Sequence, residues 1–230
     1  MNHILIMPYC FDNKFEELPE SIPLFPLNKV LLLPRAKLPL NLFENRYLHM
    51  FDYALKNDRY IGMVQPSKIS GSSSGKESSP SLYTIGCAGF VTAFSQTNDN
   101  RYEIILEGVC RFKIKKELEI KNGFRRANVQ WRKFKSDFKI EKLNSKEKRE
   151  DFLKILRPFF EKMSMNVDWE MIEGTNDEDL INTISMCCPF DVNEKQALLE
   201  AISLEDRRKV LTSLIHMNLN KNNMGSRYVS

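Results

Sequence analysis

The stretch "LFPLNKVLLLPRAKLPLNLFENRY" runs from Leu24 to Tyr47 and combines short apolar runs with three prolines before the polar "FENRY". A membrane-spanning helix needs about 20 consecutive apolar residues, and the longest apolar run here, Val30 to Leu33, is far shorter. Pro26, Pro34 and Pro39 would also interrupt a helix. Short apolar runs that end at proline are typical of buried strands. We therefore predict a strand at "VLLL", closed by Pro34, and a second extended segment at "LPLNLF".

The pattern changes at Glu44, where apolar residues begin to recur at helical spacing. The segment from Glu44 to Asn57 predicts one helix, and "YIGMVQP" predicts a short strand that stops at Pro66. The segments "LYTIGCAGFVTAFSQ", "RYEIILEGVCRFKIKKELEI" and "RRANVQWRKF" follow, rich in β-branched and aromatic residues. Turn residues at 98–100 and 122–123 separate them, which predicts an antiparallel sheet. A break in the alternation at Lys115-Lys116 indicates a β-bulge.

Beyond about residue 140 the apolar residues follow helical spacing, so the second half of the chain is predicted to be all-helical. Pro158 lies inside the first of these helices and is expected to kink or split it. Strands followed by helices indicate an α+β fold. Capping boxes mark the expected helix starts, at Asn144 and Glu147, Thr175 and Glu178, Asn193 and Gln196, and Ser203 and Asp206.

The composition is that of an ordinary soluble globular protein, with 42% apolar residues, 28% charged residues and a net charge of only +4. The five cysteines form no CxxC pair. This argues against a disulfide framework or a zinc site and suits a reducing cytosol. The N-terminus lacks the basic region of a signal peptide. We therefore expect a cytoplasmic protein without a metal or cofactor.

Catalytic patterns are absent from the sequence as well. His3, His49 and His216 lie far apart, and no nucleophile elbow accompanies them. The acidic "NDEDL" at 176–180 suits a helix N-terminus and offers too few well-spaced ligands for a metal. The serine-rich segment 67–81 contains "GSSSGKES", but a phosphate-binding loop needs a longer glycine spacing and Ser or Thr after the lysine. We interpret this segment as a mobile loop.

A basic stretch from Arg111 to Glu150 holds 15 Lys and Arg against 6 Asp and Glu, a net charge of +9. Positive and aromatic residues that interleave are one signature of RNA binding. Lysines and arginines along strands are more often the solvated face over an aromatic core. RNA binding therefore stays open as an alternative. The aromatic residues concerned are Phe112, Phe124, Trp131, Phe134 and Phe138.

Taken in order, these motifs resemble the N-terminal domain of Lon proteases. "IPLFPLNKVLLLPRAKLPLNLFENRYLHMFDYAL" resembles its opening, "YIGMVQP", "YTIGCAGFVTAF", "RYEIILEGVCRFKI" and "VQW" follow in the family's order, and "NEKQALLEAISLEDRRKVLTSLI" is similar to its helical end. The resemblance covers about residues 21–217 and is greatest to small bacterial stand-alone proteins made of the Lon substrate-binding domain alone. One departure is Arg35-Ala36, where full-length proteases usually have glycine after the proline. This makes the turn less permissive and favours the stand-alone group.

The resemblance implies a PUA-like pseudo-β-barrel at residues 21–138, followed by a helical bundle at 139–220. An N-terminal arm at 1–20 and a disordered tail at 221–230 complete the expected organisation. The family's motif positions are expected to be structural, and Arg46 is expected to pair with Glu44 or another acceptor. Those positions are Pro26, Pro34, Phe43, Glu44, Arg46, Tyr47, Gly108, Arg111 and Phe112.

The resemblance also implies a function. Lon N-terminal domains contact unfolded or degron-bearing proteins, so we expect a polypeptide-binding module, with cooperation with a protease left open. No GxxxxGK[ST] motif is present, and the chain ends where the family's nucleotide motor would begin. We therefore expect neither ATP hydrolysis nor peptide cleavage. A regulatory protein that binds one folded partner is a further alternative, and the sequence does not determine the oligomeric state.

A polypeptide-binding module requires an accessible apolar groove with adaptable walls. Methionine suits such walls because its side chain is flexible and polarisable. The sequence offers Met50, Met63, Phe90 and Phe94 as candidate binding residues on the β half of the chain.

Overall fold

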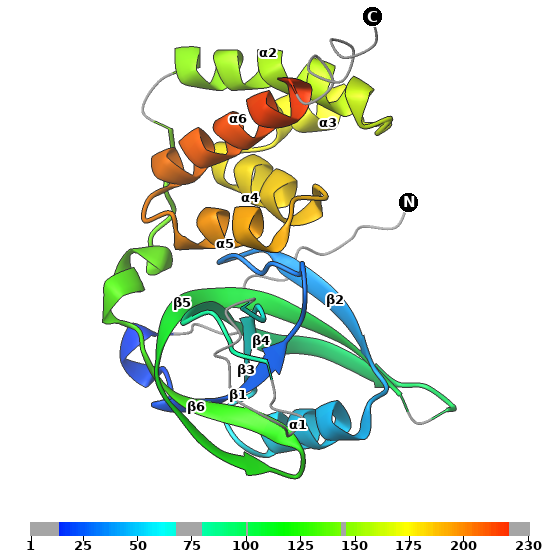
Figure 1. Cartoon of the computed structure of the whole chain (residues 1–230), viewed down its shortest axis with the longest axis vertical. Coiled ribbons are helices and arrows are strands. Elements are labelled where there is room, and N and C mark those ends of the chain that lie inside the picture. The colour runs from blue at the N-terminus through cyan, green and yellow to red at the C-terminus, as the bar shows by residue number, and fades with distance from the viewer. Residues whose placement is uncertain (1–13, 68–79, 100, 144–145, 221–230) are drawn as a thin grey trace, which may run out of the picture.

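The computed structural model describes residues 14–67, 80–99, 101–143 and 146–220, and these form two lobes (Figure 1). The strands and helix α1 make the lower lobe in that view, and the later helices make the upper lobe. Strands first and helices second confirm the predicted α+β class. Most of the predicted arm, tail and serine-rich loop, and Asn144 of the first predicted cap, lie outside the described residues.

One mixed sheet holds all six strands, in the order β2-β5-β4-β3-β1-β6. Because β6 pairs with both β1 and β5, five strands close into a ring and β2 lies outside it. The result is a curled sheet rather than a simple barrel. The strands are β1 Ser21–Pro26, β2 Lys37–Leu42, β3 Tyr60–Val64, β4 Ile85–Gln96, β5 Tyr102–Lys121 and β6 Phe124–Gln130.

The turn and the bulge near the end of β5 follow the sequence prediction. Asn122 and Gly123 have φ values of 48° and 85°, the left-handed conformations that a two-residue hairpin turn favours. The β5–β6 register shifts between Ile114 and Lys116, which places the predicted bulge at Lys115. A bulge increases the local twist, and this helps β5 to curl toward β6.

The predicted strand at Val30–Leu33 is wrong. The segment connects β1 to β2 without pairing in the sheet, although its three leucines are almost fully buried. It packs against Gly108 of β5, whose N–H donates to the Ala36 carbonyl at 2.9 Å. A Cβ on Gly108 would lie 2.0 Å from the carbonyl oxygen of Leu33, so this close approach requires glycine. The second predicted segment, "LPLNLF", does form a strand, as β2.

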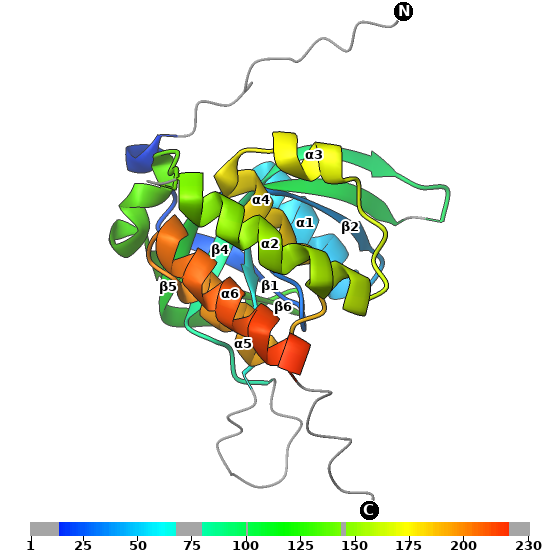
Figure 2. The same cartoon turned by 90° about the horizontal axis from the view of Figure 1, so that it is seen from above.

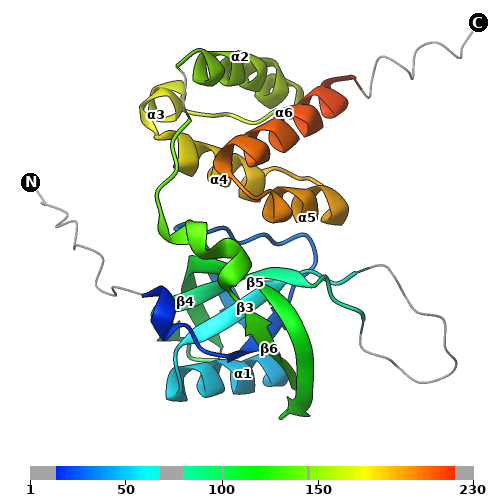
Figure 3. The same cartoon turned by 90° about the vertical axis from the view of Figure 1, so that its left-hand side faces the viewer.

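Helix α1, Asn45–Lys56, lies beneath the sheet (Figure 3). Its buried residues recur at helical spacing and face the strands. The ring of Phe51 lies 5.4 Å from that of Phe94 and 4.8 Å from that of Tyr102. The helix agrees with the predicted segment, because Glu44 and Asn57 are its N-cap and C-cap residues.

The helical lobe consists of α2 Lys146–Lys162, α3 Trp169–Gly174, α4 Asp177–Cys187, α5 Val192–Glu200 and α6 Leu204–Asn220. Helix α2 continues through Pro158 as one helix, so the predicted split does not occur. The short α3 was not predicted, and neither were two 3₁₀ segments, η1 Phe15–Glu17 and η2 Arg132–Phe138. Segments this short leave little periodicity in a sequence.

The predicted cap of α4 at Thr175 is wrong by one residue. Asn176 is the N-cap, and its side chain accepts a hydrogen bond from the Asp179 N–H at 2.9 Å. Thr175 instead ends α3. Glu178, predicted to complete the box, is buried and pairs with Arg35 of the β lobe. The competing partner is tertiary, so local sequence could not reveal it.

The predicted cap of α5 at Asn193 is wrong by two residues. Asp191 is the N-cap and forms a complete capping box with Glu194. Gln196, the predicted partner of Asn193, is buried and donates to the carbonyl of Ile85 in β4 at 3.1 Å. The prediction for α6 is correct, since the Asp206 N–H donates to Ser203 Oγ at 3.1 Å.

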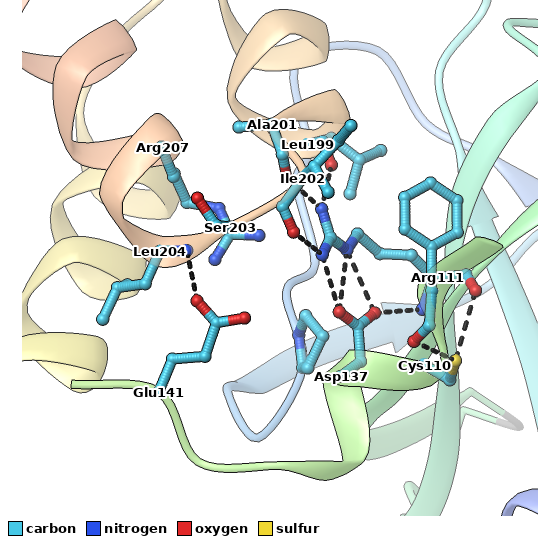
Figure 4. A network of polar contacts seen from close by, with 12 residues as sticks. Cys110, Arg111, Asp137, Glu141, Leu199, Ala201, Ile202, Ser203, Leu204 and Arg207 are labelled. Atoms are coloured by element: carbon cyan, nitrogen blue, oxygen red, sulfur yellow. Dashed lines mark hydrogen bonds and ion pairs between the residues drawn. The ribbon is translucent and has the colours of Figure 1, made fainter.

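A buried ion pair lies at the joint between the two lobes (Figure 4). Arg111 of β5 and Asp137 of η2 are 2% and 6% exposed, and Arg111 Nη2 lies 2.6 Å from Asp137 Oδ1. The same guanidinium donates to the carbonyls of Leu199 at 3.0 Å and Ile202 at 3.2 Å, where α5 ends. Carbonyl groups at a helix C-terminus carry partial negative charge. The Arg111 guanidinium therefore interacts favourably with groups of both lobes.

Arg35 makes a second link between the lobes. Its guanidinium donates to the carbonyl of Asp137 and pairs with the Glu178 carboxylate of α4. The backbone of Arg35 has a φ of 65°, a conformation that residues other than glycine adopt rarely. The departure from glycine noted in the sequence thus places a charged side chain at a strained turn, where it reaches the helical lobe.

Candidate functional site

A hollow of about 530 Å³ lies on the part of the sheet formed by β2, β5 and β4. The ends of β4 and β5 extend beyond the helices when the molecule is seen from above (Figure 2). Three consecutive residues from each strand line the hollow: Pro39, Leu40 and Asn41, then Ala93, Phe94 and Ser95, then Glu103, Ile104 and Ile105.

The register sorts these nine residues onto two faces of the sheet. Pro39 and Ala93 both lie opposite Ile105, so these three share one face. Leu40 and Phe94 both lie opposite Ile104, so they share the other face. A register shift between Val91 and Ala93 sets this alignment in β4. The bulge therefore decides which side chains of β4 stand beside those of β5.

Large apolar side chains remain exposed at and beside the hollow. Phe94 is 49% exposed and Ile105 is 37% exposed. Phe43, which directly follows β2, is 62% exposed, and the guanidinium of Arg101 lies 5.7 Å from its ring centroid. The contacts of Phe94 with Phe51 and Tyr102 hold its ring in place. A fixed, half-exposed aromatic ring beside aliphatic groups is a surface on which apolar side chains can pack.

Glu103 is the charged residue among those that line the hollow. It is exposed, and Ser95 Oγ lies 3.5 Å from its carboxylate. The hollow thus combines apolar walls with one negative charge.

Of the four residues predicted to bind polypeptide, only Phe94 lies at this surface. Met50 is 0% exposed, Met63 3% and Phe90 8%, so all three belong to the core. They are buried because Met50 lies on the inner side of α1, while Met63 and Phe90 lie in strands β3 and β4 at the centre of the sheet. Sequence alone did not separate core methionines from surface ones.

Sequence reasoning missed Ile105, although a signal was present. Ile104, Ile105 and Leu106 are three consecutive apolar residues in one strand, and alternate residues of a strand face opposite sides. Ile104 and Leu106 are buried, so Ile105 faces outward. An apolar residue out of phase with the core indicates an exposed apolar surface.

The family motif positions near α1 form a surface cluster. Arg46 Nε lies 2.9 Å from Glu44 Oε2, which confirms the predicted pair. The Arg46 guanidinium also lies 4.5 Å from the ring centroid of Tyr47, and that buried ring lies 4.3 Å from that of Phe25. Both charged side chains are about half exposed, so we expect this pair to add little to stability.

Of the remaining motif positions, Phe43 is exposed, and the others lie in turns, strands or the joint between the lobes. Pro26 ends β1, and Pro34 lies in the turn before β2. Gly108 lies in β5 and has no side chain, so the backbone of Leu33 can approach it closely. Arg111 and Phe112 are almost fully buried, Arg111 in the joint between the lobes.

The basic stretch from Arg111 to Glu150 does not form one continuous element. It covers the second half of β5, all of β6 and η2, and the start of α2. Several of its cations pair with carboxylates, as Arg125 does with Glu117 and Arg149 with Asp177. Four of its five aromatic residues are buried and the fifth, Phe138, is partly buried. The aromatic residues therefore serve the core and are not available to stack on bases.

The described residues offer little for other chemistries. Within them, no group of three or more His, Cys, Asp or Glu residues gathers as a metal would require. Burial raises the pKa of the Cys87 and Cys110 thiols, and the negative charge of Asp137 adds to both shifts. Raised pKa values disfavour the reactive thiolate. None of the helices in the described part of the chain has the length and apolar character to span a bilayer.

Comparison with known proteins agrees with this geometry. Residues 21–217 match the family described as the ATP-dependent protease La (LON) substrate-binding domain. The chain is 24% identical to a Lon protease of Syntrophus aciditrophicus over 226 residues, which cover 95% of this chain and 28% of that protein. A Lon protease of Dictyoglomus thermophilum is also 24% identical and is covered over 25% of its length. The chain thus spans about a quarter of the relatives it matches.

Two solved structures share the fold. A Lon N-terminal domain protein from Xanthomonas campestris superposes with a TM-score of 0.59 at 21% identity, over 84% of this chain and 97% of that one. The N-terminal domain of a Mycobacterium avium complex Lon protease gives a TM-score of 0.60 at 15% identity, over 85% of this chain and 98% of that one.

Proposed function

Because the chain belongs to the Lon substrate-binding domain family, we propose that it is a non-catalytic module that binds unfolded or degron-bearing polypeptides. The observation that carries the proposal is the exposure of apolar side chains on both faces of the sheet at the hollow on β2, β5 and β4, with Ile105 on one face and Phe94 on the other. Fixed apolar side chains on rigid strands give an unfolded chain a place to bury its own apolar groups.

The shape of the site favours a chain over a small metabolite. The hollow has a volume of about 530 Å³ and lies across three strands. Small-molecule sites usually have a few convergent polar groups that fix the ligand's orientation. Here Asn41, Ser95 and Glu103 supply the polar groups, and the rest of the lining is apolar. Such a surface can accept many sequences, as a binder of unfolded proteins must.

The RNA-binding alternative has less support. A base-stacking platform needs exposed aromatic rings beside cations. In the basic stretch, Phe112, Phe124, Trp131 and Phe134 are buried, and the cations are spread over strands and helices. A regulatory role toward one folded partner is tested by the same experiment as the main proposal.

The test measures binding of a fluorescently labelled, reduced and alkylated casein at about 50 mM and about 300 mM salt, with a labelled single-stranded RNA alongside. The variants are Ile105→Ser and Phe94→Ser. Ile120→Ser is the matched control, because Ile120 lies on the same strand, is 62% exposed and is remote from the hollow. Each variant is checked for a native unfolding transition, since Phe94 also contacts Phe51.

We expect wild type and Ile120→Ser to bind casein at both salt concentrations, and Ile105→Ser and Phe94→Ser to bind at least about 10-fold more weakly, the loss expected from one buried apolar side chain. Equal binding by all four proteins would contradict the proposed site. RNA binding that collapses at high salt, without casein binding, would contradict the proposed function and support the basic stretch. Failure to bind any unfolded protein would leave the folded-partner alternative.

A further inference from the structure

Strand β2 has one unpaired edge. It stands at the end of the sheet and pairs with β5 alone. Among the residues that the structure describes, no strand pairs with its other side. An open edge presents backbone N–H and C=O groups that a further extended chain can pair with. The same residues Pro39, Leu40 and Asn41 also line the hollow, so edge and hollow form one continuous surface.

The ladder determines which groups of β2 point outward. The N–H of Gly108 donates toward β2, to the Ala36 carbonyl at 2.9 Å. Backbone groups along a strand alternate in direction, so Leu106 and Ile104 of β5 also face β2. Their partners are Leu38 and Leu40. The residues between them, Lys37, Pro39 and Asn41, therefore direct their backbone groups to the open edge.

Pro39 fits this assignment because proline has no N–H to donate and is confined in sheets to such edges. The open edge thus offers a donor and an acceptor at Lys37 and at Asn41, and an acceptor alone at Pro39. Two copies of β2 paired antiparallel about Pro39 would lose both central hydrogen bonds. A separate polypeptide loses one at most, so the edge favours a different chain over a second copy.

The charge in the hollow indicates which side chains a bound segment would carry. Glu103 is the charged residue in the lining, and no ion pair involves it among the described residues. It lies opposite Asn41 in the register, beside the open edge. A lysine or arginine of a bound segment would reach this carboxylate, while alternate apolar side chains would pack near Ile105.

We propose that β2 and the hollow bind an extended, apolar polypeptide segment carrying a basic residue, added to the sheet as a further strand beside β2. This inference rests on the proposed function and specifies how the chain binds. Recognition through the backbone tolerates many sequences, while Glu103 selects segments with a positive charge.

The probe is a labelled seven-residue peptide of alternating valine and threonine with one central lysine, compared with the same peptide carrying glutamate. Asn41→Pro removes an outward N–H without removing a bond to β5. Asn41→Thr changes the same side chain and keeps the N–H, so it is the matched control. Pro39→Val adds the missing donor. Glu103→Gln removes the charge and keeps the shape.

We expect Asn41→Pro to weaken binding of the lysine peptide about 5- to 10-fold, as loss of one hydrogen bond predicts, and Pro39→Val to strengthen it by a similar factor. Asn41→Thr should bind like wild type. Glu103→Gln should remove the preference for lysine over glutamate. In hydrogen exchange, the bound peptide should slow the amides of Lys37 and Asn41.

Two results separate the inference from the proposed function. If Ile105→Ser loses casein binding but Asn41→Pro and Pro39→Val bind the peptide and casein like wild type, the added-strand inference is overturned and the polypeptide-binding function stands. If Ile105→Ser also binds casein normally, the proposed site itself fails. Concentration-dependent dimerisation of wild type that Asn41→Pro abolishes would assign the edge to a second copy and overturn the inference.

Discussion

Arg111 Nη2 lies 2.6 Å from Asp137 Oδ1, and both side chains are almost fully buried. Through its Nη1, Arg111 also lies 3.0 Å from the carbonyl oxygen of Leu199 in the helical lobe. One cation therefore connects β5, η2 and the end of α5. A buried charge that loses its partner is strongly destabilising, so the joint between the lobes depends on this pair.

Replacing Asp137 with alanine should lower the free energy of unfolding by about 3 to 5 kcal/mol, because Arg111 would remain buried without its anion. The double variant Arg111→Met with Asp137→Ala should lose much less than the sum of the losses of its two single variants, Arg111→Met and Asp137→Ala. Urea unfolding of the three variants measures this. Additive losses would show that the two residues act independently.

Arg35 allows the cost of its turn to be separated from the value of its side chain. Arg35→Ala removes the link to Glu178 but keeps a Cβ at a φ of 65°. Arg35→Gly removes the link and also the steric cost of the left-handed conformation, about 1 to 2 kcal/mol. We expect both variants to be less stable than wild type if the link outweighs the strain, with Arg35→Gly about 1 kcal/mol more stable than Arg35→Ala. Urea midpoints in the reverse order would contradict this account of the turn.

Gly108→Ala should be among the most damaging small substitutions, because its Cβ would lie 2.0 Å from a backbone oxygen of Leu33. We expect a loss of at least about 4 kcal/mol or failure to fold. Gly174→Ala is the matched control, since a Cβ at this last residue of α3 would meet nothing within 4 Å. That variant should change stability by less than about 0.5 kcal/mol. Thermal unfolding compares the two, and similar melting temperatures would refute the close-packing argument.

Tyr60 should make the protein sensitive to alkali. Burial, aided by the negative charge of Asp58, raises the pKa of Tyr60 to about 12. An unfolded tyrosine loses its proton near pH 10, so the contribution of Tyr60 is complete below about pH 10. It is then lost as the pH rises toward about 12, by up to about 1.4 kcal/mol per pH unit. Tyr60→Phe should flatten this slope in urea unfolding measured across that range. An identical slope in both proteins would exclude Tyr60 as its source.

The order of strands and helices could be predicted from the sequence because it depends on local periodicity. The segment from Glu44 to Asn57 recurs at helical spacing and forms α1, and Asn122-Gly123 forms the predicted turn. The prediction of a strand at Val30–Leu33 was wrong because a run of apolar residues indicates burial, and burial does not require pairing in a sheet. Those leucines are buried against Gly108 without joining the ladder.

The candidate site was predicted only in part for a related reason. Phe94 was among the predicted residues and is exposed at the hollow, whereas Met50, Met63 and Phe90 lie in the core. Composition suggests which side chains can bind apolar groups, but exposure depends on which face of a strand or helix is covered. The out-of-phase Ile105 was the available sequence signal, and it becomes meaningful only beside Pro39 and Ala93.

The sequence by itself determined the α+β order, the turns, the cap of α6 and the family resemblance, because each rests on neighbouring residues or on motifs in chain order. Only the tertiary structure decided the open edge of β2, the hollow beside it and the joint of Arg111 with Asp137. These features bring together residues distant in sequence, such as Asn41 with Glu103 and Arg111 with Leu199. Their energies come from burial and pairing across the fold, which no local pattern records.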